Sequence, residues 1–364
     1  MKILKEVLSL LTAPFHEGEV IEYIEKFCAT EGFRLRRDRY NNLFIRYKRG
    51  KARQPVILTA HMDHPGFEII QAGANSRALA GILGGINIDK CKGAGVAVMT
   101  KTGIVRGRVA KKDPRRKWMK KPVFEIEFKK RDLQKIRRGD YGWYDLPAFE
   151  LKGDLVHTKG ADNLAGVAVL LELLTLLKRS GKKADVTALF TRAEEVGFIG
   201  CSAVARSGRF SASIPVIVIE CSSAASGGIK IGEGPVVRVG DKLTCYSTAI
   251  DRWLSQIAAR EALKDKKFKF QRALLAGGTC EASVWALKGA STGGIAVPLG
   301  NYHNNGKRGV APEFISRRDY KALLKFLNAV VLSGRFAGSL DTSKTVLAKI
   351  YKLWERKLKL SSPR

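Results

Sequence analysis

Cysteine pairs at metal-binding spacing are missing from this sequence of 364 residues. No two cysteines form a C-x-x-C pair, so a structural zinc knuckle is not expected. A chain of this length can bury a large hydrophobic core, so a disulfide framework is not expected either. The cysteines are Cys28, Cys91, Cys201, Cys221, Cys245 and Cys280.

Long apolar runs are also missing. No stretch of about 18 apolar residues occurs, so we expect neither a membrane span nor a membrane partner. The apolar run near the start is interrupted by Glu6 and is followed by no small-residue cleavage site. This pattern favours an amphipathic helix over a signal peptide and makes the cytoplasm the expected location.

Acidic residues are scarce relative to basic ones. The chain has 65 Lys and Arg against 34 Asp and Glu, which gives a formal net charge of +31. Such a field attracts polyanions. The charge is spread along the chain with a local peak over 111–121, which favours a solvated basic surface over a dedicated nucleic-acid face. Nucleic acid is therefore not the expected partner, although the charge permits it.

Strand and helix patterns alternate over most of the chain. Apolar periodicity predicts a strong helix over 161–181 that ends at Gly181, and further helices near both ends of the chain. Strands alternating with helices predict an α/β fold with a mostly parallel central sheet flanked by helices. The predicted buried strands of this sheet lie at 56–58, 184–195, 211–223 and 291–304.

Residues 66–156 have a different texture. Short β-like runs alternate there with glycine turns, and no pattern of a three-turn helix occurs. The segment is typical of a small all-β domain inserted into the α/β framework. We therefore expect a catalytic α/β domain made of residues 1–65 and 157–364, and an inserted β domain at 66–156.

Histidine is rare, with five in the chain, yet two stand where predicted strands end. In an open α/β sheet, ligands bind beyond the carboxyl ends of the strands. Each acid or imidazole there could singly be an N-cap or an ordinary core residue. Their convergence on one rim instead indicates a metal site. The candidates are His61, Asp63, Asp162, Glu194, Glu195, Glu220 and His303.

Two divalent cations about 3.5–4 Å apart need a bridging carboxylate, and Asp162 fits that position. The neighbours Glu194 and Glu195 point in opposite directions on leaving a strand. Glu195 can therefore reach a metal, while Glu194 reaches the bound water as a general base.

The remaining candidates complete this arrangement. His61 and Glu195 or Glu220 would divide between the two ions, and His303 would complete one of them. Asp63 follows His61 by two residues and suits the task of holding an imidazole N–H.

The segments that carry these residues resemble the cocatalytic dinuclear zinc metallopeptidases of the glutamyl and tetrahedral (deblocking) aminopeptidase family. The similar segments are "AHMDHPGF", "GADNLAGVAVLLELL", "TRAEEVGFIGCSA", "IGEGPVVRVGDK", "AGGTCEAS" and "GIAVPLGNYH", in the same order, and the resemblance covers nearly the whole chain. It implies a zinc-peptidase-like fold and an inserted domain that makes dimers. It also implies two divalent metal ions, with zinc expected and Co or Mn as alternatives.

The resemblance also implies roles for single residues. Glu194 would be the general base and Asp63 the orienting acid. The metal ligands would be His61, Asp162, Glu195, Glu220 and His303.

Some positions depart from the family pattern. Glu220 stands where aspartate is usual. Cys280 with Glu281, and Gly300 with Asn301, differ on the side where substrate would dock. We expect Cys280, Glu281 and Asn301 to contact substrate, with Glu281 as the candidate for holding its amino terminus.

The expected function is a metal-dependent aminopeptidase that hydrolyses N-terminal residues of peptides through a metal-bridging hydroxide. A carboxypeptidase or N-acyl-amino-acid deacylase with the same metal chemistry is the second hypothesis. A non-catalytic basic protein that binds nucleic acid on a hydrolase fold is the third. We expect a peptide substrate and a homodimer, with a larger homo-oligomer as an alternative.

Overall fold

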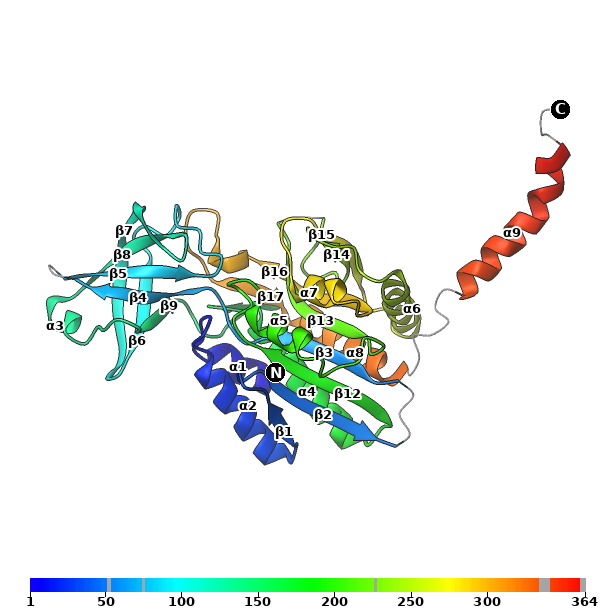
Figure 1. The fold of residues 1–364 in the computed structure, drawn as a ribbon, viewed down its shortest axis with the longest axis horizontal. Helices are drawn as coiled ribbons and strands as arrows, with labels where there is room; N and C mark the ends of the chain where they lie inside the picture. The colour runs from blue at the N-terminus through cyan, green and yellow to red at the C-terminus, as the bar shows by residue number, and fades with distance from the viewer. Residues whose placement is uncertain (51–53, 74–75, 226–227, 334–340, 361–364) are drawn as a thin grey trace.

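The computed structural model describes residues 1–50, 54–73, 76–225, 228–333 and 341–360. Two sheets organise the chain. A large sheet carries helices on both of its faces, and a closed six-stranded barrel projects from one end of this body (Figure 1).

The large sheet is mixed, so the prediction of a mostly parallel sheet is wrong in this detail. Its centre is parallel, but an antiparallel hairpin adds to one edge and antiparallel strands add to the other. The parallel centre runs in the order β12 (Ala184–Thr191), β3 (Val56–His61), β13 (Val216–Ser223) and β16 (Thr292–Gly300).

The hairpin at one edge follows from its turn. Asp38 accepts hydrogen bonds from the amides of Tyr40 and Asn42, and Asn41 adopts a left-handed φ of 62°. Asp and Asn favour such turns because their short side chains bond to the local backbone. The turn joins β1 (Leu35–Arg37) to β2 (Leu43–Arg49), and β2 pairs with β12.

The other edge is built from distant parts of the chain. There β16 pairs with β17, which pairs with β11 and then β10. A further pair, β14 and β15, joins β16. These strands are β10 (Glu150–Lys152), β11 (Leu155–Thr158), β14 (Val236–Asp241), β15 (Gln271–Leu275) and β17 (Glu313–Ser316).

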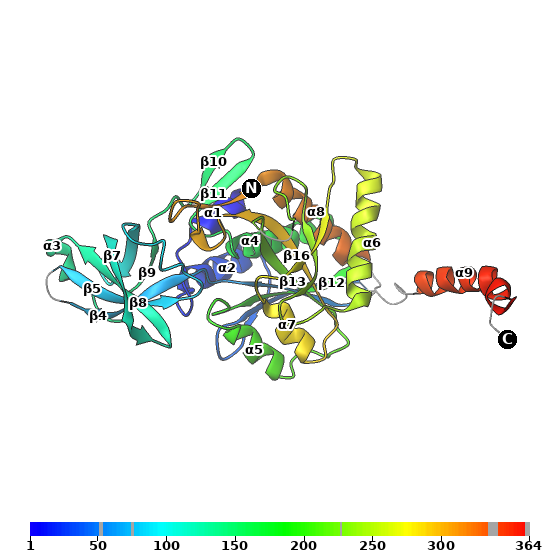
Figure 2. The ribbon, with the colours of Figure 1, turned by 90° about the horizontal axis from the view of Figure 1, so that it is seen from above.

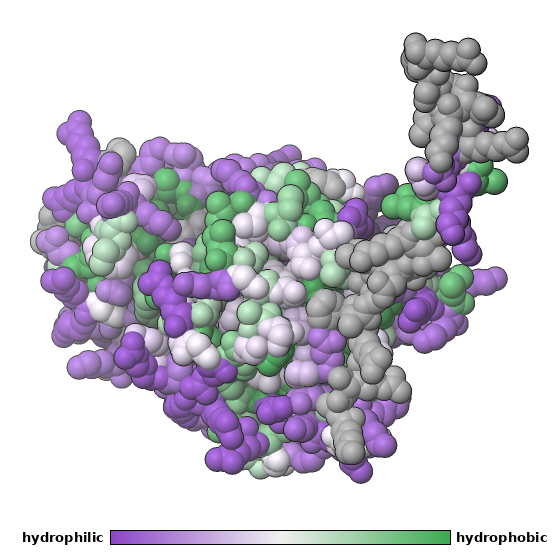
Figure 3. Space-filling view, turned by 45° about the vertical axis from the view of Figure 1, so that its right-hand side comes forward, coloured by the Kyte–Doolittle hydropathy of each residue, from purple (hydrophilic) through white to green (hydrophobic). Residues whose placement is uncertain are grey.

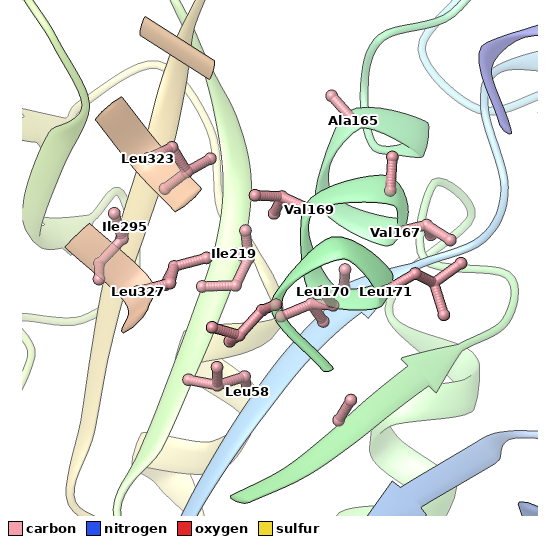
Figure 4. Packing of buried hydrophobic residues seen from close by; sticks show 14 of the residues in the cluster. Leu58, Ala165, Val167, Val169, Leu170, Leu171, Ile219, Ile295, Leu323 and Leu327 are labelled. Atoms are coloured by element: carbon pink, nitrogen blue, oxygen red, sulfur yellow. The ribbon is translucent and has the colours of Figure 1, made fainter. Parts of the chain in front are cut away.

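Helix α4 (Leu164–Ser180) is the central helix of the core. Its N-cap Asn163 accepts a hydrogen bond from the Gly166 amide, and it ends at Gly181 with φ 62°. Figure 4 shows Val169 of α4 beside Ile219 of β13. Twelve of its 17 residues are buried, because the helix packs against both the sheet and other helices.

The helices form a layer on each face of the sheet. Helices α4 and α8 cover one face, and α5 and α7 cover the other (Figure 2). Helix α1 packs on α4, and α6 packs on α8 and β14. The bounds are α1 (Lys2–Ser9), α2 (Gly18–Glu31), α5 (Ile199–Arg206), α6 (Thr248–Lys264), α7 (Glu281–Leu287), α8 (Arg317–Ser333) and α9 (Asp341–Leu360).

The barrel has its own hydrophobic core around Phe67, Phe124 and Ile126. Its strands are β4 (Gly66–Ala72), β5 (Arg77–Leu83), β6 (Gly95–Thr100), β7 (Gly103–Trp118), β8 (Lys121–Phe128) and β9 (Tyr141–Tyr144), with the short α3 (Lys130–Leu133) before β9. Strands β10 and β11 follow the barrel in the chain but belong to the large sheet. The division into domains at 66–156 stays a prediction.

Hydrophilic side chains cover much of the face drawn in Figure 3, as the charge of +31 leads one to expect. Among the described helices, none combines the length and the apolar character needed to cross a bilayer.

Candidate metal centre

The carboxyl ends of the parallel strands deliver the predicted residues to one cavity of about 480 Å³. His61 ends β3, and Glu194 and Glu195 follow the end of β12. Glu220 lies within β13, and His303 follows β16 in a single turn of 3-10 helix. Because these strands are parallel neighbours, their ends meet at one edge of the sheet. The cavity walls include His61, Asp162, Glu194, Glu195, Glu220 and His303.

Asp162 lies between the two imidazole rings. Its Oδ1 is 3.5 Å from Nε2 of His61, and its Oδ2 is 4.0 Å from Nε2 of His303. Each oxygen of one carboxylate therefore faces a different histidine. This is the arrangement that a carboxylate shared by two cations requires.

Glu194 and Glu195 are neighbours in the chain, but their carboxylates face different histidines. Glu195 Oε1 lies 3.1 Å from Nε2 of His303, whereas Glu194 Oε2 lies 4.0 Å from Nε2 of His61. Glu220 Oε2 lies 3.9 Å from the same His61 nitrogen. The possible ligand atoms thus form two groups, one of His61, Glu194 and Glu220 and one of Asp162, Glu195 and His303.

The site is crowded with buried charge. Burial opposes the charged form of His61, but the nearby carboxylates of Glu194 and Asp162 raise its pKa well above the ordinary value. Burial also raises the pKa of Glu194 well above its usual range and that of Glu220 to about 8. Burial first, and then repulsion from neighbouring carboxylates, disfavours negative charge on these side chains.

Three buried polar atoms indicate whether divalent cations fit this site. Asp162 Oδ1, Glu220 Oε1 and His303 Nε2 are buried and have no hydrogen-bond partner within the described part of the chain. A buried polar atom without a partner costs stability unless something else coordinates it. Imidazole nitrogen and carboxylate oxygen are ligands that zinc takes, so the donor set fits divalent cations.

Asp63 holds the backbone of the paired glutamates. Its two carboxylate oxygens accept hydrogen bonds from the amides of Glu194 and Glu195, each at 3.0 Å. Its backbone carbonyl lies 3.0 Å from Nδ1 of His61, whereas its carboxylate lies 3.6 Å from that nitrogen. The carboxylate therefore fixes the paired glutamates, and the imidazole contact that we expected from it comes from the backbone.

Sequence reasoning missed two further buried acids that hold the site together. Glu313 accepts hydrogen bonds from the amides of Asp162 and His303, at 3.0 and 2.7 Å. Glu17 accepts one from the amide of Ala193 and forms an ion pair with Arg192. The only signal that the sequence offers for Glu313 is an acid directly before the short apolar pair Phe314–Ile315 of β17.

The barrel also reaches this cavity. A Cβ atom at Gly85 would lie 2.3 Å from Nδ1 of His303, so only glycine lets the loop after β5 approach the ring this closely. Lys121, the first residue of β8, lines the cavity and donates to the carbonyl of Gly84. The inserted segment thus shapes the mouth of the metal centre.

Of the three residues expected to contact substrate, only Cys280 is among the residues that line the cavity. Glu281 is fully buried outside it and accepts a hydrogen bond from Thr59, and Asn301 donates to the carbonyl of Pro312. Neither Glu281 nor Asn301 is among the residues that line the cavity, so the geometry gives neither a place against substrate.

Arg238 of β14 is a cavity residue that the sequence analysis did not single out. It is 2% exposed, donates through Nε to Ser222, and bonds to the Cys221 carbonyl through Nη2. Its Nη1 is buried and, among the described residues, has no hydrogen-bond partner. A charged residue in the apolar run "PVVRVG" was the available signal.

Comparison with known proteins agrees with this geometry. A family model described as M42 glutamyl aminopeptidase matches residues 41–326. A curated protein of Acetivibrio thermocellus, provisionally named an aminopeptidase, is 26% identical over 315 residues, which cover 83% of this chain and 91% of that protein.

Two solved structures are similar in fold. The TET aminopeptidase from Thaumarchaeota archaeon SCGC AB-539-E09 has a TM-score of 0.79 at 19% identity, covering 93% of this chain and 99% of its own. The Pyrococcus horikoshii TET1 peptidase, described as assembling into a tetrahedron or a large octahedral shell, has a TM-score of 0.75 at 24% identity. Its match covers 91% of this chain and 98% of its own.

The family match spans most of the chain and includes every residue of the two ligand groups. The chain therefore belongs to the M42 glutamyl aminopeptidase family of metal-dependent peptide hydrolases.

Proposed function

We propose that this chain removes N-terminal residues from peptides at a centre of two divalent cations. One observation carries the proposal. Two imidazoles face the two oxygens of one buried carboxylate, and two more acids lie beside them. Such a concentration of buried imidazoles and carboxylates around one cavity is typical of a functional site.

Five residues would hold the cations. His61 and Glu220 would hold one, Glu195 and His303 the other, and Asp162 would be shared. When bound, the cations would polarise the scissile carbonyl and lower the pKa of water, which makes it nucleophilic near neutral pH. Zinc suits this ligand set, with cobalt or manganese as alternatives.

Glu194 is positioned for proton transfer. Its carboxylate lines the cavity, and Asp63 fixes its backbone. A carboxylate that faces the bound water without holding a metal is suited to act as a general base. It would take a proton from the attacking water and return it to the leaving amine.

Arg238 would give the cavity a preference for substrates with an acidic side chain. Its Nη1 has a free donor in a buried wall of the cavity, as far as the described residues show. A guanidinium binds carboxylates strongly when it is out of water. We expect substrates with an acidic N-terminal residue to be favoured, with that side chain on Arg238.

The barrel is the proposed dimer interface. It projects from the catalytic body (Figure 1), and its loop at Gly85 and Lys121 already contributes to the site. A homodimer is the smallest assembly that we propose, and larger shells are known of the Pyrococcus horikoshii protein.

The test of this function is Glu194→Gln. We expect kcat on free-amine aminoacyl-anilides to fall by about 10²- to 10⁴-fold, because the general base is lost. The metal content should stay that of the wild type, because Glu194 is not assigned as a ligand. The matched control is Glu150→Gln, on the edge strand β10, which should leave kcat unchanged.

Substrates with an acetylated amine separate this function from deacylation. An aminopeptidase should cleave the free-amine anilides and leave the acetylated ones intact. Normal turnover by Glu194→Gln, or a preference for acylated substrates, would show the proposal to be wrong.

A further inference from the structure

A second cavity, of about 370 Å³, lies away from the metal centre. We call it the arginine groove. Four arginines and two phenylalanines are among the residues that line it: Arg34, Arg36, Arg46, Arg209, Phe44 and Phe210.

The groove lies at the other end of the parallel strands. Val56, the first residue of β3, lines it, whereas His61, the last residue of β3, lines the metal centre. The strand length between Val56 and His61 is about 16 Å, at roughly 3.3 Å per residue. The groove is therefore separate from the catalytic cavity.

Strand register puts the groove's side chains on one face. Arg36 pairs with Phe44 across β1 and β2, and Arg46 pairs with Thr187 across β2 and β12. Paired residues on neighbouring strands point to the same face of a sheet. The segment after α5, which carries Arg209 and Phe210, closes the groove from above that face.

The groove carries more positive charge than the neighbouring Asp185, which does not line it, can balance. Asp185 binds Arg46 through two hydrogen bonds of 2.7 and 2.6 Å. Arg34, Arg36 and Arg209 form no ion pair with any carboxylate among the residues that the structure describes. Arg34 and Arg36 are two residues apart in an extended segment, so both can reach one anion.

The groove also offers flat surfaces. The guanidinium carbon of Arg209 lies 4.7 Å from the centroid of the Phe44 ring. Phe210 is half-buried, and its ring centroid is 5.9 Å from that of Phe44. Aromatic rings and guanidinium planes of this kind stack with nucleobases.

We propose that the arginine groove binds a nucleoside phosphate, with the phosphate on Arg34 and Arg36 and the base against Arg209 and Phe210. An acidic peptide could bond to the same arginines but would leave the stacking surfaces unused. The source is either a free nucleotide or an exposed nucleotide of RNA, which the overall charge of +31 would attract.

The test uses the full-length, metal-loaded chain with fluorescently labelled ADP and, separately, a labelled single-stranded RNA. Fluorescence polarisation gives Kd for the wild type and for Arg34→Glu/Arg36→Glu. We expect Kd to rise by about tenfold or more, because two charge-assisted contacts to phosphate are lost. Hydrolysis of aminoacyl-anilides should be unchanged, which shows that the variant folds.

A matched control separates a local site from the general field. Lys101→Glu/Arg138→Glu makes the same charge change at exposed positions of the barrel segment. Its Kd should stay within about twofold of the wild type at physiological salt, where charges farther than roughly 8 Å are screened.

Both sources of the nucleotide would support the proposal. RNA binding that unlabelled ADP displaces assigns the groove to RNA, and ADP binding without RNA binding assigns it to free nucleotides. Three results would overturn it: no nucleotide or RNA binding by the wild type, equal weakening in both double variants, or displacement by polyglutamate but not by unlabelled ADP.

Discussion

At the scale of single residues, Arg238 in the wall of the metal centre has an N–H donor group that its hydrogen bonds to the protein do not use. Arg238 uses Nε and Nη2 on Ser222 and the Cys221 carbonyl. Those two bonds fix the plane of the group, while Nη1 has no partner among the described residues. A substrate carboxylate could bind there without any rearrangement of the wall.

Arg238→Met tests this role. The ratio of kcat/KM for glutamyl-anilide to that for leucyl-anilide should fall by about 10- to 100-fold, the effect of one hydrogen bond to a charged group. The ratio is informative because general damage to the site affects both substrates alike. Arg260→Met, at an exposed position of α6, serves as the control. An unchanged ratio would remove Arg238 from substrate recognition.

Strand exits made the ligand candidates predictable, because polar residues follow apolar runs there. His61 and Glu195 are visible in this way. Arg238 and Glu313 were missed because each bonds to backbone that is distant in sequence. Glu281 was expected against substrate because its position departs from the family pattern on the side where substrate would dock. In the structure the helix that begins at Glu281 is packed so that this side chain is buried in the core.

At the scale of elements, a buried lysine joins the first helix to the loop before α4. Lys159 donates to the carbonyl of Leu8, near the end of α1, at 2.7 Å. Burial lowers the pKa of this ammonium group to about 8. The group is therefore charged at neutral pH at a cost to stability, and the cost disappears as the proton leaves.

Lys159→Met tests this contact through its dependence on pH. The unfolded chain keeps its lysine proton up to pH of about 10.4, whereas the folded chain loses it near pH 8. Between these values the unfolded state binds more protons, so the stability of the wild type rises with pH. Between roughly pH 7 and pH 10, the free energy of unfolding of the wild type should rise by about 2 kcal/mol relative to that of Lys159→Met.

Urea unfolding at each pH measures the difference. Lys288→Met, at an exposed position after α7, should follow the wild type at every pH. Parallel curves for the wild type and Lys159→Met would mean that Lys159 titrates alike in both states.

Elements with strong local signals were the predictable ones. The helix predicted over 161–181 is confirmed as α4, because a cap marks each of its ends. The mixed character of the sheet was not predictable. Strand β17 pairs antiparallel with β16 on one side and with β11, which is distant in the sequence, on the other. No local pattern reports such distant pairing.

At the scale of the whole molecule, a net charge of +31 opposes any association of identical chains. Salt screens such repulsion, with a Debye length near 10 Å at 0.1 M. We expect the proposed dimer to be favoured when salt is raised from about 0.02 to 0.5 M. Light scattering after size exclusion would show the increase in mass. A decrease with salt would mean that attractive charge pairs hold the assembly.

The central claim is that two divalent cations are held between His61, Asp162, Glu195, Glu220 and His303. Metal content measured by mass spectrometry on the active, purified chain, before and after chelation, tests it most directly. We predict two cations per chain, loss of aminoacyl-anilide hydrolysis as they are removed, and recovery when zinc is restored. Full hydrolysis by a chain that holds less than one cation would contradict the account.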